Sequence, residues 1–255
     1  MNLKDCVTVV TGGASGLGEA TVRIMVEHGG KVAIFDFDEK RGERVSSELG
    51  NAVIFCKTDV TDEQSVKAAI DKTIKSFGSI HVAINCAGVG TPAKILGKEG
   101  PMSMDLFNRV VQINLMGTMN VIRFAAEKMV KNTPNEDGEK GIIINTASVA
   151  AFEGQVGQAA YSASKAGVVG ITLPIAREFA DYGIRVAAIA PGLFETPMLA
   201  MLPEKAKEAL GKMIPFPKRL GKPVEFAMLA QHIIENPMIN GEVIRLDGAI
   251  RMAAK

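Results

Sequence analysis

Two side chains of this sequence, Tyr161 and Lys165, have the types and the spacing that proton-transfer chemistry requires. They stand four residues apart, so on a helix they lie on one face, one turn from each other. An ammonium beside a phenol favours the phenolate and lowers the tyrosine pKa from about 10 towards neutrality. Ser148 could hydrogen-bond the same substrate oxygen. A Tyr–Lys pair of this spacing is also common on plain helix surfaces, and only the surrounding chain distinguishes the two interpretations.

Hydrophobic patterning predicts the elements that position this pair. Residues 142–144 are three consecutive isoleucines, which is typical of a strand buried on both faces, and Ser148 follows that strand. A helix over 158–181 then carries the Tyr–Lys pair. Another long helix is predicted over 103–129, and it contains Asn114, a polar residue on an otherwise apolar pattern.

A glycine-rich turn, Thr11-Gly-Gly-Ala-Ser-Gly-Leu-Gly18, connects a predicted buried strand over 6–11 to a helix that reaches about Glu27. Glycines between a strand and a helix allow a phosphate to approach backbone N–H groups, and the helix N-terminus favours the negative charge. Glycines also form ordinary turns, so the motif gains weight from its position between the two elements. Its candidate ligands for a diphosphate are Gly12, Gly16 and Gly18.

Asp36 ends the next predicted strand, 31–36, about twenty residues beyond the glycine-rich turn. An acidic residue at this place binds both hydroxyls of an adenosine ribose and repels a 2′-phosphate. The sequence therefore favours NAD over NADP as the cofactor. Lys40 and Arg41 follow closely and leave the NADP alternative open.

Further strands are predicted over 52–57, 81–84, 185–190 and 242–246, with helices over 39–49 and 62–77 in between. This alternation predicts a parallel sheet with right-handed crossovers. The expected fold is α/β, a single Rossmann-type, doubly wound domain over 1–255 with a seven-stranded, mostly parallel sheet. Ligands of such sheets bind at the carboxyl ends of the strands, and four polar candidates fall there: Asp36, Asp59, Asn85 and Ser148.

Composition argues against several other classes of function. The net charge is +1 without a basic block, so a nucleic-acid partner is not expected. Three cysteines and three histidines are too scattered for a disulfide framework or a metal site. No apolar run is long enough to cross a membrane and no signal peptide is recognisable, so a cytoplasmic location is expected.

Taken in order, Thr11–Gly18, Asn85–Gly88, Asn114, Ser148 and Tyr161-Ser-Ala-Ser-Lys165 resemble the motifs of the classical short-chain dehydrogenase/reductase family. The resemblance covers the whole chain. It implies that four residues are catalytic, with Asn114 holding a water that relays protons from Lys165: Asn114, Ser148, Tyr161 and Lys165. It also implies these cofactor-binding residues: Gly12, Ser15, Gly16, Leu17, Gly18, Asp36, Asp59, Val60, Asn85, Cys86, Ala87, Gly88, Tyr161, Lys165, Pro191, Gly192, Phe194 and Thr196.

Stretches 146–161, 190–194 and 240–252 are similar to the type II 3-hydroxyacyl-CoA dehydrogenases, a subgroup also described as hydroxysteroid dehydrogenases. Insertions over 93–102 and 131–140 fit the same subgroup, although the sequence of 93–102 departs from its pattern. The resemblance implies NAD-dependent interconversion of a secondary alcohol and a ketone, with an acyl-CoA or a steroid as substrate. It also implies a homotetramer, located in mitochondria if the source is an animal.

Several expectations concern the substrate. Gln155 and Gln158 are candidates for substrate contact, together with Ser148 and Tyr161, although both glutamines could equally serve loop structure. The segment 193–217 is expected to be a lid over an apolar substrate, the alternative being an ordinary amphipathic helix and turn. Two other functions stay open: an NADP-dependent 3-oxoacyl reductase of fatty-acid synthesis, and a non-catalytic NAD-binding scaffold.

Overall fold

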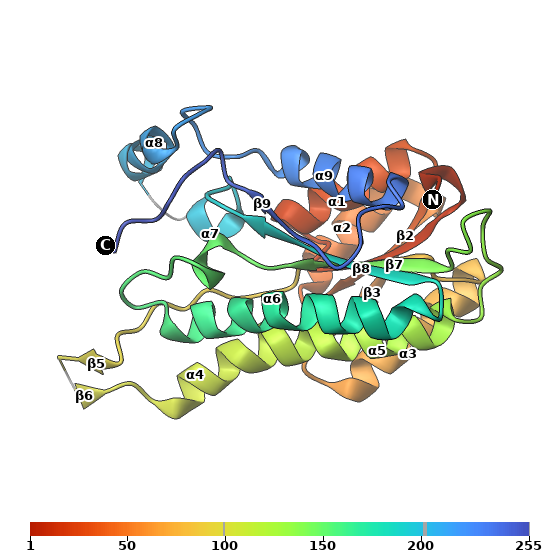
Figure 1. The fold of residues 1–255 in the computed structure, drawn as a ribbon, viewed down its shortest axis with the longest axis horizontal. Helices are drawn as coiled ribbons and strands as arrows, with labels where there is room; N and C mark the ends of the chain where they lie inside the picture. Colours follow the sequence, from red (N-terminus) through yellow and green to blue (C-terminus); the bar gives the residue numbers. More distant parts are fainter. Residues whose placement is uncertain (99, 201–202, 255) are drawn as a thin grey trace.

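A seven-stranded parallel sheet forms the centre of the molecule in the computed structural model, which describes residues 1–98, 100–200 and 203–254 (Figure 1). Its strands are β1 (Val7–Thr11), β2 (Lys31–Asp36), β3 (Val53–Lys57), β4 (Val82–Asn85), β7 (Gly141–Thr146), β8 (Ile184–Pro191) and β9 (Val243–Leu246). The spatial order is β3-β2-β1-β4-β7-β8-β9, and every pairing is parallel. The strand order therefore reverses between β1 and β4, which is where ligands of doubly wound sheets bind.

Helices cover both faces of this sheet (Figure 1). On one face lie α1 (Gly16–Glu27), α2 (Glu39–Leu49) and α9 (Pro223–Glu235). On the other lie α3 (Glu63–Phe77), α4 (Met104–Val111), the π turn η3 (Gln112–Met116), α5 (Gly117–Met129) and α6 (Ala159–Ala180). Three short 3₁₀ turns complete the framework: η1 (Leu3–Asp5), η2 (Gly50–Ala52) and η4 (Val149–Ala151).

Alternate residues of the central strands supply two separate cores. Ile142 and Ile144 of β7 pack on the α1–α9 side, whereas Ile143 between them packs on the α5–α6 side, and all three are fully buried. The expectation of a strand buried on both faces is confirmed. Such a strand requires an uninterrupted run of apolar residues, because helices cover both faces of the parallel sheet and exclude water from them.

The predicted α/β fold and its seven strands are confirmed, and the sheet is wholly parallel. The helix expected over 103–129 is instead divided by η3 at Asn114. The insertion 93–102 carries a two-stranded antiparallel hairpin, β5 (Leu96–Gly97) and β6 (Gly100–Pro101), that the patterning missed. Segment 193–217 contains α7 (Pro197–Ala200) and α8 (Glu204–Met213), while residues 201 and 202 lie outside the described residues. No helix within the described ranges is long and apolar enough to cross a bilayer.

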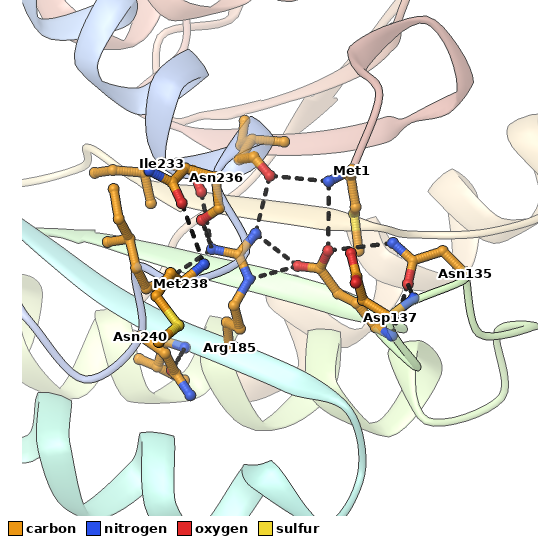
Figure 2. Close-up of polar contacts among 12 residues, drawn as sticks. Met1, Asn135, Asp137, Arg185, Ile233, Asn236, Met238 and Asn240 are labelled. Atoms are coloured by element: carbon orange, nitrogen blue, oxygen red, sulfur yellow. Dashed lines mark hydrogen bonds and ion pairs between the residues drawn. The ribbon is translucent and has the colours of Figure 1, made fainter.

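A buried ionic network closes the end of the sheet at which β8 begins (Figure 2). The Arg185 guanidinium donates to Glu139 Oε1 at 2.6 Å, and the side chains are 8% and 5% exposed. The guanidinium also donates to four backbone carbonyls at and after the end of α9: Ile233, Ile234, Asn236 and Ile239. Arg185 thus satisfies the last carbonyls of α9 and links them to the loop that precedes β7.

We expect Arg185→Met to destabilise the fold by about 3–5 kcal/mol, because it leaves the Glu139 carboxylate and several helix-end carbonyls buried without this donor. Chemical denaturation of the variant measures the loss. Arg123→Met is the matched control, since its ion pair with Glu63 is about half exposed (46% and 53%) and exposed pairs contribute about 0–1 kcal/mol. Equal stability of the two variants would contradict a stabilising role for the buried Arg185 network.

Candidate active site

Ser148 and Tyr161 lie together at the carboxyl end of β7. Ser148 follows that strand and caps η4, where its Oγ accepts a hydrogen bond from the Ala150 N–H at 3.1 Å. Tyr161 is in the first turn of α6. Burial raises the pKa of Tyr161 above its ordinary value, and a hydrogen bond with the Ser148 side chain acts in the opposite direction. The phenol is therefore held protonated and in contact with the serine hydroxyl.

Lys165 lies one helical turn beyond Tyr161 and is 4% exposed. Its Nζ donates to the Thr146 carbonyl at 2.6 Å and lies 5.8 Å from the centroid of the Tyr161 ring. Burial lowers the pKa of Lys165 to about 8. In this geometry desolvation dominates at the phenol and the Lys165 amine bonds to a backbone carbonyl, so the lowering of the Tyr161 pKa by this amine stays a prediction.

Asn114 occupies the middle of the π turn, a distortion that frequently marks functional sites. Its Nδ2 donates to the Val89 carbonyl at 2.9 Å and to Ser164 Oγ at 3.0 Å, and its Oδ1 accepts from the Val89 N–H at 2.8 Å. Ser164 Oγ in turn donates to the Tyr161 carbonyl at 2.7 Å. The side chain of Asn114 is thus committed to positioning its neighbours. Its backbone carbonyl accepts a hydrogen bond from Thr118 Oγ1 at 2.8 Å, and the expected role of Asn114 in holding a water stays a prediction.

The sequence interpretation missed Val89 and Ser164. Ser164 sits between Tyr161 and Lys165 in the sequence motif, and its small size and hydroxyl were the available signals. Val89 carried no signal, because its backbone rather than its side chain meets Asn114.

The glycine-rich loop between β1 and α1 is shaped to hold a phosphate group. A Cβ on Gly12, whose φ is +64°, would come within 2.9 Å of the Ala87 N atom, and a Cβ on Gly18 would collide with the Gly12 carbonyl. Ser15 is the N-cap of α1, yet within the described structure its hydroxyl makes no capping bond. The hydroxyl and the first N–H groups of α1 therefore face outward as donors for an anion.

Asp36 is fixed beside this loop at the end of β2. Its Oδ2 accepts from the Ala14 N–H and its Oδ1 from the Asp38 N–H, both at 3.0 Å. Each oxygen keeps a lone pair for a hydroxyl, as ribose binding requires. Asp59, after β3, accepts from the backbone and the hydroxyl of Thr61 through one oxygen. These residues fit an adenosine ribose and its neighbouring base.

The segment Asn85–Gly88 joins the two halves of the candidate site. Ala87 N–H donates to Thr11 Oγ1 at 3.0 Å, and a Cβ on Gly88 would meet Asn114 Oδ1 at 3.1 Å and Lys165 Nζ at 3.6 Å. Asn85 is buried, and its Nδ2 donates to Asn145 Oδ1 at 2.9 Å. Burial raises the pKa of Cys86 to about 11, so its thiol stays neutral.

The loop after β8 completes the site from the opposite side. Gly192 packs so closely on Asp247 that a Cβ would lie 2.9 Å from the Asp247 Cβ, and Phe194 is 6% exposed. Thr196 lies across from Gly16, and a Cβ on that glycine would be 3.8 Å from the Thr196 Cβ. A cleft of about 840 Å³ runs between the glycine-rich loop and residues 195–220.

Gln155 and Gln158 are hydrogen-bonded within the loop itself. The Gln155 N–H donates to Gln158 Oε1, and Gln155 Nε2 donates to the Ala253 carbonyl, both at 3.0 Å. These bonds support the loop-structure alternative, and substrate contact stays a prediction. No group of His, Cys, Asp and Glu side chains that could hold a metal ion occurs among the residues with described positions.

Comparisons with known proteins agree with this geometry. A family model described as short chain dehydrogenase matches residues 6–207. The chain belongs to the short-chain dehydrogenase family, whose members are NAD- or NADP-dependent oxidoreductases of secondary alcohols. It is a homologue of 3-hydroxyacyl-CoA dehydrogenase type-2. Proteins of that name from Drosophila melanogaster and Homo sapiens are each 54% identical to it, and the alignments cover 98% of this chain and 99% and 97% of theirs. The crystal structure of 3-hydroxyacyl-CoA dehydrogenase type-2 from Mycobacterium avium gives a TM-score of 0.93 at 44% identity, with 98% of this chain and 97% of that chain covered.

We expect the Lys165 amine to titrate with a midpoint near pH 8, because burial disfavours its charge. Its ammonium form then predominates below that pH and its neutral form above it. NMR of protein labelled with ¹³C at lysine Cε measures the midpoint, and Lys165→Met assigns the signal. Lys57, whose pKa a Glu39 hydrogen bond raises, serves as the internal reference. A Lys165 midpoint at or above that of Lys57 would contradict the expectation.

Proposed function

We propose that this protein interconverts 3-hydroxyacyl-CoA and 3-oxoacyl-CoA with NAD as the cofactor. The observation that carries the reaction class is the placement of Ser148 at the carboxyl end of β7 and of Tyr161 in the first turn of α6, beside the buried amine of Lys165. The substrate class rests on the relatives of the same length that carry the 3-hydroxyacyl-CoA dehydrogenase name. Hydroxysteroids, which have the same secondary alcohol, are a further substrate class of this proposal.

Tyr161 acts as the proton donor in the reducing direction. Its raised pKa keeps the phenol protonated near neutral pH, so its O–H can protonate the substrate oxygen as the carbonyl is reduced. Ser148 hydrogen-bonds the same oxygen and stabilises the negative charge that develops there. Lys165, largely protonated at pH 7, stabilises the phenolate that remains. In oxidation the phenolate removes the hydroxyl proton. Bound nicotinamide supplies the hydride acceptor or donor.

Asp36 supports NAD rather than NADP. Two backbone N–H groups hold its carboxylate at the carboxyl end of β2, where it would meet a ribose 2′-substituent. A 2′-phosphate would face this charge at short range. Arg41, one of the two residues that left NADP open, forms an ion pair with Asp38 at 3.3 Å. The proposal therefore favours an acyl-CoA enzyme over a biosynthetic NADP-dependent reductase.

Segment 193–217, which forms one side of the cleft beside the glycine-rich loop, is proposed to be a lid over the acyl substrate. Leu193, Leu199 and Leu210 pack against Ile214 and Ile250 in a small apolar cluster of their own, separate from the two cores on the sheet. A cover with its own cluster can move as a unit while the sheet stays intact. The family expectation of a homotetramer is retained as part of the proposal.

Replacement of Tyr161 by Phe tests the proton donor. We expect kcat to fall by about 10²–10⁴-fold, the usual contribution of general acid catalysis, while NADH binding, measured by fluorescence titration, is unchanged. Stopped-flow NADH oxidation with acetoacetyl-CoA measures the rate. Turnover of the variant at the wild-type rate would remove Tyr161 from this role.

Asp36→Asn tests the cofactor preference. Wild-type protein is expected to oxidise NADH much faster than NADPH with acetoacetyl-CoA, and the variant to lose most of this preference, because the amide no longer repels a 2′-phosphate. Asp38→Asn is the matched control: it removes a neighbouring charge and keeps the N-cap of α2. Wild-type preference for NADPH would reject the NAD proposal. Absence of acetoacetyl-CoA turnover with either cofactor would reject the acyl-CoA proposal.

A further inference from the structure

Glu153 lies in the catalytic loop, defined as residues 149–158 between Ser148 and Tyr161, and it binds a distant part of the chain. Its carboxylate accepts hydrogen bonds from both Nη atoms of Arg245, at 2.9 and 3.2 Å, and from the Met252 N–H at 3.0 Å. Arg251 Nε lies 3.3 Å from it. The Arg245 hydrogen bond is the main reason that the pKa of Glu153 is below its ordinary value. The loop is thereby held by groups from β9 and the residues after it.

Arg245 bridges this loop to the turn after β8 that contains Gly192. Its Nε donates to Asp247 Oδ2 at 2.8 Å, and the Asp247 side chain is 7% exposed. Asp247 is the residue that packs on Gly192, in the turn after β8. Arg245 also lies 5.4 Å from the centroid of the Phe152 ring. One guanidinium therefore joins the catalytic loop to the turn after β8, whose Gly192 is a cofactor-binding candidate.

The C-terminal segment, residues 248–254, lies between this loop and segment 193–217 (Figure 1). On the loop side, Ala253 and Ala254 accept hydrogen bonds from Gln155 Nε2 and the Val156 N–H at 3.0 and 3.1 Å. On the other side, the Gly248 carbonyl accepts from the Phe216 N–H at 3.3 Å. Ile250 and Met252 pack with the leucines of the proposed lid. The C-terminal segment thus contacts both the catalytic loop and segment 193–217.

We propose that Glu153 and Arg245 are positioning residues that hold the C-terminal segment as a wall between the catalytic loop and segment 193–217, and so select apolar acyl chains longer than acetoacetyl. The inference rests on the proposed function. The pair, whose side chains are 22% and 23% exposed, joins the catalytic loop to β9 and the C-terminal segment and takes no part in either core of the sheet. Its contribution is therefore local: it fixes where Ile250 and Met252 lie.

Glu153→Gln and Arg245→Lys test the wall. Gln removes the charge at constant size, and Lys keeps the charge but loses the bidentate bond. With NADH, we expect kcat/KM for 3-oxodecanoyl-CoA to fall about tenfold through KM, and for acetoacetyl-CoA about twofold or less, because only the longer chain reaches the wall. Glu63→Gln, which breaks an exposed ion pair with Arg123 outside the lining of the cleft, is the control and should leave both values unchanged.

Hydrogen–deuterium exchange of the NADH-bound protein measures, without a substrate, how firmly the C-terminal segment is held. Glu153→Gln should increase exchange in peptides covering 152–158 and 248–254 and nowhere else. Equal losses for both acyl chains, or faster exchange across the whole sheet, would reduce the pair to a general structural role and overturn the inference. Wild-type exchange rates in both peptides would overturn it as well. If wild-type protein reduces no acyl-CoA, the proposed function is rejected, and the acyl selectivity with it. The exchange result still decides whether Glu153 and Arg245 hold the C-terminal segment.

Discussion

The central strands of this sheet are buried on both faces, and that constraint governs where chemistry can occur. β4, β7 and β8 pack between helices on two sides, and their side chains are buried along almost their whole length. Polar groups are tolerated chiefly where these strands end, and in a parallel sheet those ends meet at one edge. Ser148 and the Thr146 carbonyl that binds Lys165 are at that edge, as is Asp36 after β2.

Burial also sets the electrostatics of the candidate site. It raises the pKa of Tyr161 and lowers that of Lys165 to about 8, so the two groups are both driven towards their neutral forms. Ser148 is the neighbour that opposes this effect at the phenol. A protonated phenol is ready to donate, which suits reduction of a ketone at neutral pH. Oxidation requires the phenolate and therefore a more alkaline medium or added positive charge nearby.

Two ionic networks serve different ends of the molecule. Arg185 and Glu139 are nearly inaccessible to water and connect the amino end of β8 to the end of α9. Their ion pair therefore contributes to the stability of the fold. Glu153 and Arg245 are partly solvated at the opposite end, and they connect loops rather than cores. Desolvation explains the difference, because an ion pair that keeps water contributes little to folding yet still restrains the groups that it joins.

The sequence alone determined the order of strands and helices, the glycine-rich turn, and the placement of Asp36, Ser148, Tyr161 and Lys165, because each depends on local periodicity or on a motif of fixed spacing. The tertiary structure decided what those patterns do not encode. Asn114 lies in a π turn and binds the backbone of Val89, and Gln155 binds the Ala253 carbonyl in the C-terminal segment. Likewise, the Lys165 amine bonds to the Thr146 carbonyl, and burial sets the direction in which the tyrosine pKa is shifted. These outcomes depend on burial and on contacts between segments far apart in the chain, neither of which leaves a mark in local spacing.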